Sequence, residues 1–128
     1  MPIASNGIDV VINMFAPTPS EEFSRVIKKD GFLIKTFVLR NHLIELKKAV
    51  YDKAYYNDEE NEEVEGFKLI EAVKTEKTIH IDGEKDITNL FCMTPYYYKT
   101  SKSDQQKLNG LKAFDTTLQV MTGIYKKL

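Results

Sequence analysis

The chain has 128 residues with 18 basic and 19 acidic side chains, so its formal net charge is −1. This balance excludes a global field that would attract the protein to nucleic acid or to an anionic membrane, although a local basic patch can still form. The lone cysteine, Cys92, excludes an internal disulfide framework and a cysteine-based zinc cluster.

The length and an ordinary 42% share of hydrophobic residues predict one globular domain over residues 1–128. No apolar run approaches the roughly 18 residues that a membrane span requires. Met1–Asn6 lacks the basic and apolar regions of a signal peptide. We therefore expect a cytoplasmic protein with no membrane partner.

The first predicted element lies in Gly7–Pro17, which reads GIDVVINMFAP. An unbroken apolar run closed by small residues and a proline predicts a strand, Ile8–Met14, buried on both faces and ending in a tight turn. Ligands of open α/β sheets bind outside the carboxyl ends of such strands. We therefore expect the chemistry at Asn13–Pro17. The alternative is that these five residues form only a strand-ending turn.

A helix is predicted next, because Ser20 is a good N-cap and apolar residues then recur at helical spacing. It is expected to end at Lys29, before a turn at Asp30-Gly31 in which the glycine can adopt a positive φ. Phe32–Leu39 is rich in β-branched and aromatic residues and predicts a second strand. Strand, helix and strand with short joints predict a parallel βαβ unit.

The middle of the chain predicts a helix from Asn41 to about Tyr55, followed by the acid-rich segment Asn57–Glu65. A solvated loop is the favoured interpretation of this segment. The alternative, a metal site, lacks the glycine-centred ligand spacing of a calcium loop. Period-two alternation from Gly66 to Asp82 then predicts one long strand or two short ones, antiparallel and with one face solvated.

Two helices and a strand complete the predicted order. The first helix begins at Asp86 or Thr88 and ends at Met93, before a proline. Ser103 with a glutamine three residues later predicts a capped helix from Asp104 to about Lys112. The last strand is Thr116–Tyr125. The whole order is half of a doubly wound α/β sheet with an antiparallel addition.

Five segments in chain order resemble the carboxyl-terminal half of the 23S rRNA (guanine-N1)-methyltransferases, which are class I, S-adenosylmethionine-dependent enzymes. The segments are DVVINMFAP, EEFSRVIKKDG, HLIELKKAVYD, EGF and MTPYYY. The resemblance runs from about Met1 to Leu128, and HLIELK and MTPY are its more specific parts. It implies a partial Rossmann-like class I sheet of strands four to seven with flanking helices. These strands would be Ile8–Met14, Phe32–Leu39, Phe67–Ile81 and the antiparallel Thr117–Tyr125.

The resemblance also implies site roles around a bound S-adenosylmethionine, with no metal. Asn13, Met14, Phe15, Ala16 and Pro17 match the segment that lines the methyl donor and the target base. Asn13 and Phe15 would be the catalytic pair. The amide or a backbone carbonyl of Asn13 would accept a hydrogen bond from the base, and the aromatic ring would stack or form the pocket wall. Methyl transfer of this kind gains mostly from positioning the reactants in a dry pocket.

Binding of the rRNA substrate is expected at His42, Tyr96, Tyr97 and Lys99. The Tyr96–Tyr98 run, with Lys99 and Lys102, can stack on RNA bases and hold phosphates. The alternatives are that one or two of the tyrosines pack in the core and that His42 has a capping or surface role. The family has Pro-Gly-Pro before the His-Leu pair where this chain has other residues, a departure on the substrate side.

The six glycines form no G-x-G cluster of the kind that binds the donor in class I enzymes. We therefore expect a segment of such an enzyme, inactive by itself. The alternative is a self-standing, non-catalytic interaction or dimerisation module derived from the same fold. Class I sheets place strand four beside strand one, so Ile8–Met14 would become an apolar edge here. Such an edge predicts a homo-oligomer.

Overall fold

The structure is a computed structural model that describes residues 1–51 and 62–128. Contacts divide the described residues into two compact units. Unit 1 comprises residues 1–40, 62–75 and 120–128, and unit 2 comprises residues 41–51 and 76–119. The elements in chain order are β1 (Ile8–Met14), α1 (Ser20–Val26), β2 (Ile27–Val38), α2 (Ile44–Val50), β3 (Phe67–Asp82), α3 (Glu84–Cys92), the 3₁₀ turn η1 (Tyr97–Lys99), α4 (Lys102–Gln105), the 3₁₀ turn η2 (Gln106–Leu108) and β4 (Ala113–Lys127).

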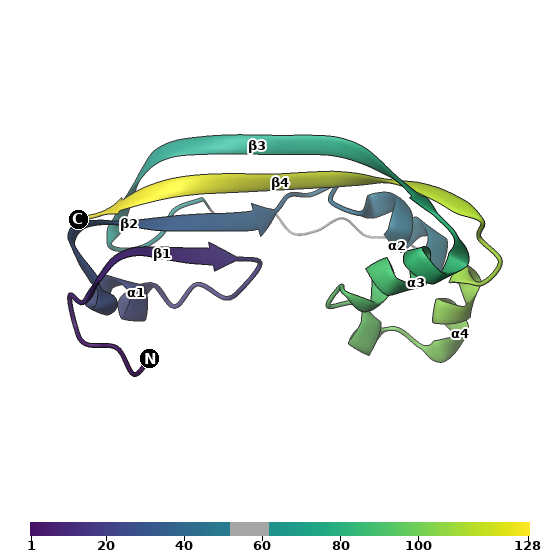
Figure 1. The fold of residues 1–128 in the computed structure, drawn as a ribbon, viewed down its shortest axis with the longest axis horizontal. Helices are drawn as coiled ribbons and strands as arrows, with labels where there is room; N and C mark the ends of the chain where they lie inside the picture. Colours follow the sequence, from purple (N-terminus) through teal and green to yellow (C-terminus); the bar gives the residue numbers. More distant parts are fainter. Residues whose placement is uncertain (52–61) are drawn as a thin grey trace. The chain divides into compact units, whose positions relative to one another are not determined.

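The four strands form one mixed sheet in the order β1-β2-β4-β3. In unit 1, β1 runs parallel to β2 and ends with Met14 opposite Thr36 (Figure 1). β4 runs antiparallel to β2, and the hydroxyls of Thr36 and Thr122 lie 3.0 Å apart where the two strands meet. The predicted parallel unit and the antiparallel last strand are both present.

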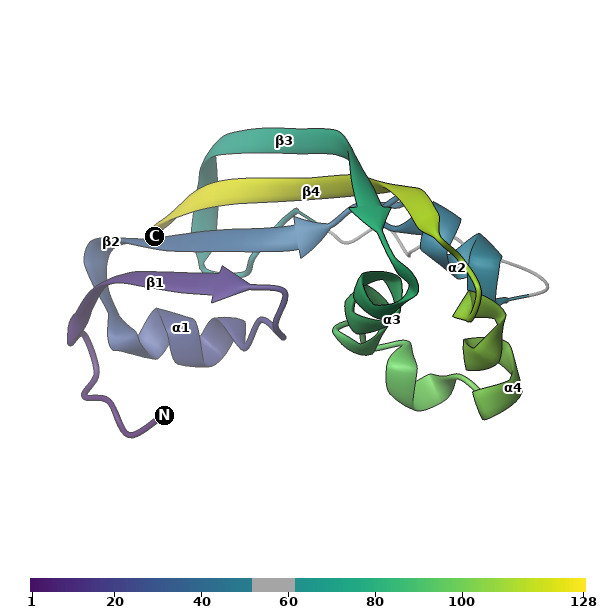
Figure 2. The same cartoon turned by 45° about the vertical axis from the view of Figure 1, so that its right-hand side comes forward.

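The core of unit 1 lies between α1 and the sheet. Figure 2 shows α1 running along β1 on one face of the sheet. Seven buried side chains from α1, β2, the segment before β3, the start of β3 and β4 form this core, and they are Phe23, Val26, Ile27, Leu33, Val64, Phe67 and Tyr125. The apolar stripe predicted for the first helix therefore does cover the sheet.

The end of α1 differs from the prediction. The helix ends at Val26, whose carbonyl accepts a hydrogen bond from the Gly7 N–H at 2.9 Å. Ile27 is already extended and pairs with Ile8, so sheet pairing ends the helix three residues before the predicted Lys29. The turn predicted at Asp30-Gly31 is absent, because β2 runs without interruption from Ile27 to Val38. The pairing with β1 shifts register between Ile8 and Val10 instead, and the positive φ of 62° belongs to Asp30, not to Gly31.

Gly31 is needed for space. An added Cβ would lie 2.6 Å from the Ile27 Cγ2 atom and 2.8 Å from the Asp9 carbonyl oxygen. No real Cβ makes such contacts, so β1 and β2 approach each other here only because residue 31 has no side chain.

β1 lies at the edge of the sheet and is not buried on both faces as its apolar run predicted. Val10, Ile12 and Met14 are 44%, 66% and 58% exposed, respectively. On the other face, Val11 packs against the core of unit 1 and Asn13 is buried. The edge position agrees with the expectation from the family resemblance.

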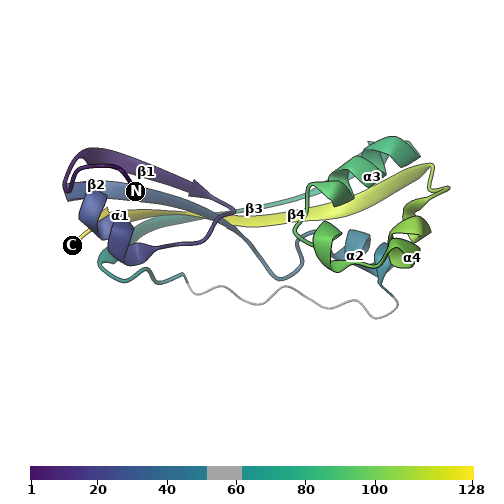
Figure 3. The ribbon, with the colours of Figure 1, turned by 90° about the horizontal axis from the view of Figure 1, so that it is seen from below.

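Helices gather around the ends of β3 and β4 in unit 2 (Figure 3). Six buried side chains form its core, and they are Leu43, Leu46, Val50, Ile87, Phe91 and Leu108. α2 begins at Ile44, because Leu43 adopts a left-handed φ of 53° and the Asn41 side chain caps nothing. The predicted continuation over residues 52–55 and the first part of the acidic segment, residues 57–61, lie outside the described residues.

Three other predictions need correction. α3 begins at Glu84, directly after Gly83, and so starts two residues before Asp86. α4 begins at Lys102, two residues before the predicted Asp104, because the Ser101 hydroxyl rather than Ser103 accepts the capping hydrogen bond from the Asp104 N–H at 3.2 Å. It ends at Gln105, where the 3₁₀ turn η2 follows. β3 is one continuous strand, but residues 68–78 are exposed throughout, so no covered apolar face runs along its middle.

No helix in the described part of the chain is long and apolar enough to cross a membrane.

Replacing Gly31 with alanine is expected to lower the free energy of unfolding by about 1–3 kcal/mol, because the added Cβ meets backbone atoms that the β1–β2 pairing holds in place. Urea denaturation measures this change. The exposed Lys29 is the matched control, and its replacement with alanine is expected to alter stability by less than about 0.5 kcal/mol. Equal effects of the two substitutions would contradict the close approach.

Candidate functional site

The segment after β1 is held by the side chain of Asn13. This residue is only 5% exposed, and its Nδ2 atom donates hydrogen bonds of 3.2 Å to the Pro17 carbonyl and to the Thr18 hydroxyl. Because a carbonyl can only accept, the contact with Pro17 fixes which side-chain atom is the nitrogen. The Oδ1 atom accepts no hydrogen bond from any residue that the structure describes. The amide nitrogen of Asn13 therefore closes the loop, and the amide oxygen is available to accept a hydrogen bond from a ligand.

Phe15 is the strained residue of this loop. Its φ is 52°, in the left-handed region that costs a residue other than glycine about 1–2 kcal/mol. The Phe15 N–H donates to the Thr36 carbonyl at 3.0 Å, which anchors the strained backbone to β2. The ring itself is 58% exposed. A bulky aromatic residue in a conformation that favours glycine is typical of functional sites.

The loop forms one apolar wall. Met14, the last residue of β1, and Phe15, Ala16 and Pro17, which follow it, are all exposed. S-adenosylmethionine carries a sulfonium, a ribose and an adenine. An aromatic wall with the free Asn13 oxygen fits contact with a flat, polar ring, but residues 13–18 contain no carboxylate for the ribose hydroxyls. The loop therefore fits one side of a site for the methyl donor and its target.

His42 and the tyrosine run belong to unit 2, whereas the Asn13–Pro17 loop belongs to unit 1. The Nδ1 atom of His42 accepts a hydrogen bond from the Gln119 N–H at 3.1 Å, so this nitrogen carries no proton. Burial of the half-buried ring lowers the pKa of His42, and the positive charge of Lys47 lowers it further. His42 thus has a structural partner, and its role in substrate binding stays a prediction.

The three consecutive tyrosines have different surroundings. The Lys47 Nζ atom lies 4.6 Å from the centroid of the Tyr96 ring, and the Lys47 side chain is almost fully buried. Tyr97 makes an edge-to-face contact with Phe91, with ring centroids 6.4 Å apart. Both tyrosines pack against the core of unit 2, as the alternative interpretation had it, while Tyr98 and Lys99 are exposed. The structure therefore gives different surroundings to three tyrosines that the sequence could not distinguish.

Sequence reasoning missed two anchoring groups, and the partners of the first are distant along the chain. Glu45 accepts hydrogen bonds from the Thr117 N–H at 2.9 Å, from the Thr117 hydroxyl at 2.7 Å and from the Thr116 hydroxyl at 3.1 Å. Burial raises the pKa of Glu45, but these hydrogen bonds outweigh it and leave the pKa below its usual value. The second group is Thr18, whose hydroxyl helps Asn13 close the loop.

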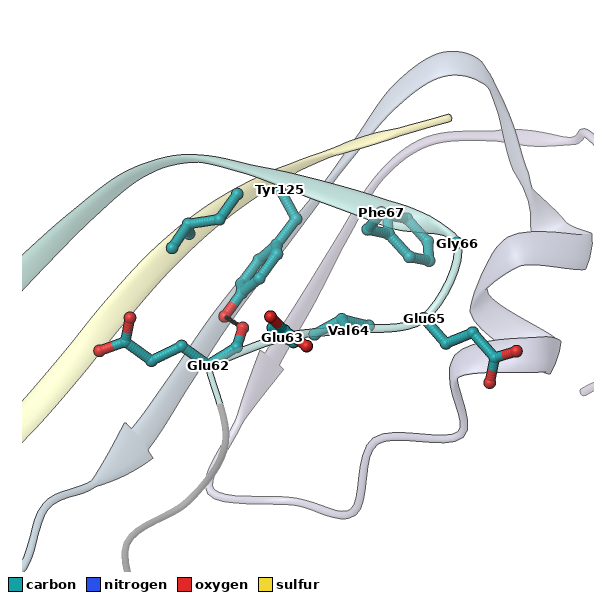
Figure 4. A pocket seen from close by; sticks show the side chains of 8 residues that line it. Glu62, Glu63, Val64, Glu65, Gly66, Phe67 and Tyr125 are labelled. Carbon is teal, nitrogen blue, oxygen red and sulfur yellow. Dashed lines mark hydrogen bonds between the residues drawn. The ribbon is translucent and has the colours of Figure 1, made fainter.

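A cavity of about 820 Å³ lies elsewhere in unit 1, where β3 begins (Figure 4). Three glutamates, Phe67 and Tyr125 are among its lining residues, and the Tyr125 hydroxyl donates to the Glu62 carbonyl at 2.5 Å. None of the predicted site residues lines it. Within residues 1–51 and 62–128, no group of three or more histidine, cysteine, aspartate or glutamate side chains is arranged to hold a metal ion.

Comparisons with solved structures identify the fold. A protein provisionally described as a methyltransferase from Bacillus halodurans superposes with a TM-score of 0.60 at 16% sequence identity, covering 99% of this chain and 67% of that one. The YcgJ protein of Bacillus subtilis superposes with a TM-score of 0.52 at 9% identity and the same coverage. The chain therefore has part of a class I methyltransferase fold, as predicted.

A sequence comparison then gives a particular relative. YxjB of Bacillus subtilis, provisionally named a 23S rRNA (guanine-N(1)-)-methyltransferase, is 31% identical over 126 residues. The alignment covers 93% of this chain and 44% of YxjB, so the chain spans less than half the length of this relative. The resemblance to the 23S rRNA methyltransferases is thereby confirmed. No protein-family model matches the chain.

The two histidines are expected to titrate on opposite sides of the ordinary histidine pKa of about 6.5. Both ring nitrogens of His80 face carboxylate oxygens, from Asp115 at 2.5 Å and Asp82 at 2.8 Å, and these hydrogen bonds raise the pKa of His80. Its stabilisation is therefore present below about pH 6.5 and is lost as the pH rises through the folded-state pKa. His42 has a lowered pKa, so its stabilisation is present above about pH 6.5 and is lost as the pH falls through its folded-state pKa.

An NMR titration of the imidazole signals tests this pair, with His42→Gln used to assign them. We expect one midpoint below and one above about 6.5. Two midpoints on the same side would contradict the assigned hydrogen bonds.

Proposed function

We propose that this chain supplies the strand-four to strand-seven part of an S-adenosylmethionine-dependent methyltransferase that modifies N1 of a guanine in 23S rRNA. The observation that carries the proposal is the Asn13–Pro17 loop, with its free acceptor and its strained aromatic residue, in a chain 31% identical to YxjB. The cytoplasm is the expected location.

The loop residues act by position. When bound, S-adenosylmethionine supplies a methyl group on a sulfonium sulfur. The Asn13 Oδ1 atom accepts a hydrogen bond from the edge of the guanine and so orients the ring nitrogen toward that methyl group. The exposed Phe15 ring forms an apolar wall that keeps water away from the reacting atoms. Alignment and exclusion of water are the main sources of rate in such a transfer.

Activity requires groups beyond this loop. The sequence of this chain has no glycine-rich donor loop, and the loop described above contains no ribose-binding carboxylate. We infer that the 128 residues alone transfer no methyl group and that the donor-binding residues correspond to the part of YxjB that the alignment leaves uncovered. The exposed edge of β1 is where a parallel strand from that part would pair.

A second candidate function is a self-standing interaction module without catalysis. The exposed apolar side chains of β1 favour it, because an unpaired strand edge with Val10, Ile12 and Met14 beside it readily pairs with another chain. In this case we infer a homo-oligomer in which β1 of one copy pairs with β1 of another. The two candidates use the same edge and therefore exclude each other within one molecule.

A methyl-transfer assay tests the first candidate. By titration calorimetry, the chain alone is expected not to bind S-adenosylmethionine with a micromolar dissociation constant, which would be a binding free energy of about −8 kcal/mol. A fusion of the uncovered part of YxjB to this chain is expected to bind the donor and to methylate 23S rRNA. Asn13→Ala in the fusion is expected to lower the rate about 100-fold through misplacement of the base. Val73→Ala, at an exposed position in β3, is the control and is expected to keep the rate. A fusion that binds the donor but methylates no guanine would refute the proposal.

Light scattering tests the second candidate. At micromolar concentration the chain is expected to be a dimer or a higher oligomer. Ile12→Lys is expected to make it monomeric, because a charge on the exposed face of the edge opposes pairing. Val73→Lys, on the exposed strand β3, is the matched control and is expected to leave the oligomer intact. A monomeric unmodified chain would contradict the homo-oligomer.

A further inference from the structure

Tyr98 stands apart from the two tyrosines before it. Its side chain is 88% exposed, more than any other large hydrophobic side chain in the described ranges. Its ring meets Tyr97 edge to face, with centroids 5.1 Å apart and an interplanar angle of 79°. Tyr97 is in turn held by Phe91. The ring is therefore supported on one side and open to solvent elsewhere.

Hydrogen bonds fix the turn that carries this ring. The Gln105 Nε2 atom donates to the Tyr97 carbonyl at 3.1 Å and to the Thr100 carbonyl at 2.9 Å. The Thr100 hydroxyl donates to the Tyr96 carbonyl at 2.7 Å and lies 2.5 Å from the Tyr51 hydroxyl. A ring presented on so constrained a turn loses little conformational freedom when it binds a ligand.

The charges around the turn are basic. Lys99 and Lys102 are exposed, and within the described residues neither forms an ion pair. Asp104, the acidic residue of this stretch, is bound to Lys107 at 2.9 Å. Its charge is therefore largely balanced, and two lysines remain to attract an anionic partner. An exposed aromatic ring next to uncompensated lysines is the combination that binds single-stranded nucleic acid, because bases stack while cations meet the phosphates.

We propose that Tyr98 stacks on an unpaired base of single-stranded RNA and that Lys99 and Lys102 contact the neighbouring phosphates. The proposal rests on the proposed function for its choice of RNA as the partner. It assigns base stacking to Tyr98 and gives Tyr96 and Tyr97, which pack against the core of unit 2, the role of supporting the turn.

The chain contains no tryptophan, so Tyr98→Trp creates a single fluorescent reporter at the proposed stacking position. Titration of this full-length variant with a single-stranded RNA of 12 nucleotides is expected to quench its emission as a base stacks on the indole. A 12-unit abasic ribose-phosphate strand is expected to bind through the lysines without quenching. RNA binding without quenching would overturn the proposal, as would the absence of RNA binding.

Substitutions complete the test by fluorescence anisotropy with labelled RNA. Tyr98→Ala is expected to weaken binding about 5- to 150-fold, the range for loss of one stacked base, while Tyr98→Phe retains the affinity. Met93→Ala removes another highly exposed apolar side chain and is expected to leave the affinity unchanged. Thermal unfolding is expected to be the same for Tyr98→Ala and the unmodified chain, since the ring is exposed. An unchanged affinity of Tyr98→Ala would overturn the proposal.

The reporter also identifies a competing occupant. If the emission of Tyr98→Trp depends on protein concentration without RNA, another copy of the chain covers the ring, and the proposal fails. None of these measurements involves the methyl donor. Failure of Tyr98 to stack on RNA would therefore not refute methyl transfer by the fusion. Failure of the methyl-transfer assay would likewise not refute the stacking of Tyr98 on RNA.

Discussion

The parallel pairing of β1 with β2 is the constraint on which the candidate site depends. β1 ends with Met14 opposite Thr36, while β2 continues to Val38. The next hydrogen bond, from the Phe15 N–H to the Thr36 carbonyl, continues the pairing into the loop. That bond holds Phe15 at its positive φ, and the buried Asn13 amide closes the loop from the other side. The close approach at Gly31 keeps the strands together at their opposite end. The position of the loop is therefore a consequence of the sheet.

The same strand that positions the loop leaves its outer face uncovered. Three apolar side chains alternate along β1 toward solvent, while the opposite face packs against the core. An exposed face of this kind is unusual for an apolar strand, and it gives the edge a strong tendency to pair. The two functions that we propose, pairing with a donor-binding part and self-association, would use this one surface. Which of them applies depends on what pairs with β1.

In unit 2, polar side chains attach the segment around α2 to β4 and to Tyr96. Glu45 binds the backbone and side chains of β4, His42 accepts a backbone hydrogen bond of β4, and a buried lysine lies against Tyr96. Two of the residues in these contacts, His42 and Tyr96, are among those predicted from the sequence to bind the substrate. Tyr98 and its neighbouring lysines are exposed, and they are the groups that we propose to contact RNA.

The sequence by itself determined the kinds of element and their order, because apolar periodicity, turn residues and caps act locally. It also determined the position of the loop at Asn13–Pro17, since a proline and small residues end an apolar strand there. Only the tertiary structure decided where α1 ends, because pairing with Ile8 draws Ile27 into the sheet. Only the tertiary structure decided that the outer face of β1 is open to solvent and that Tyr98, unlike Tyr96 and Tyr97, is exposed. Both outcomes depend on neighbours that are distant along the chain. Local patterns specify what a segment can form, whereas burial depends on what the rest of the chain places against it.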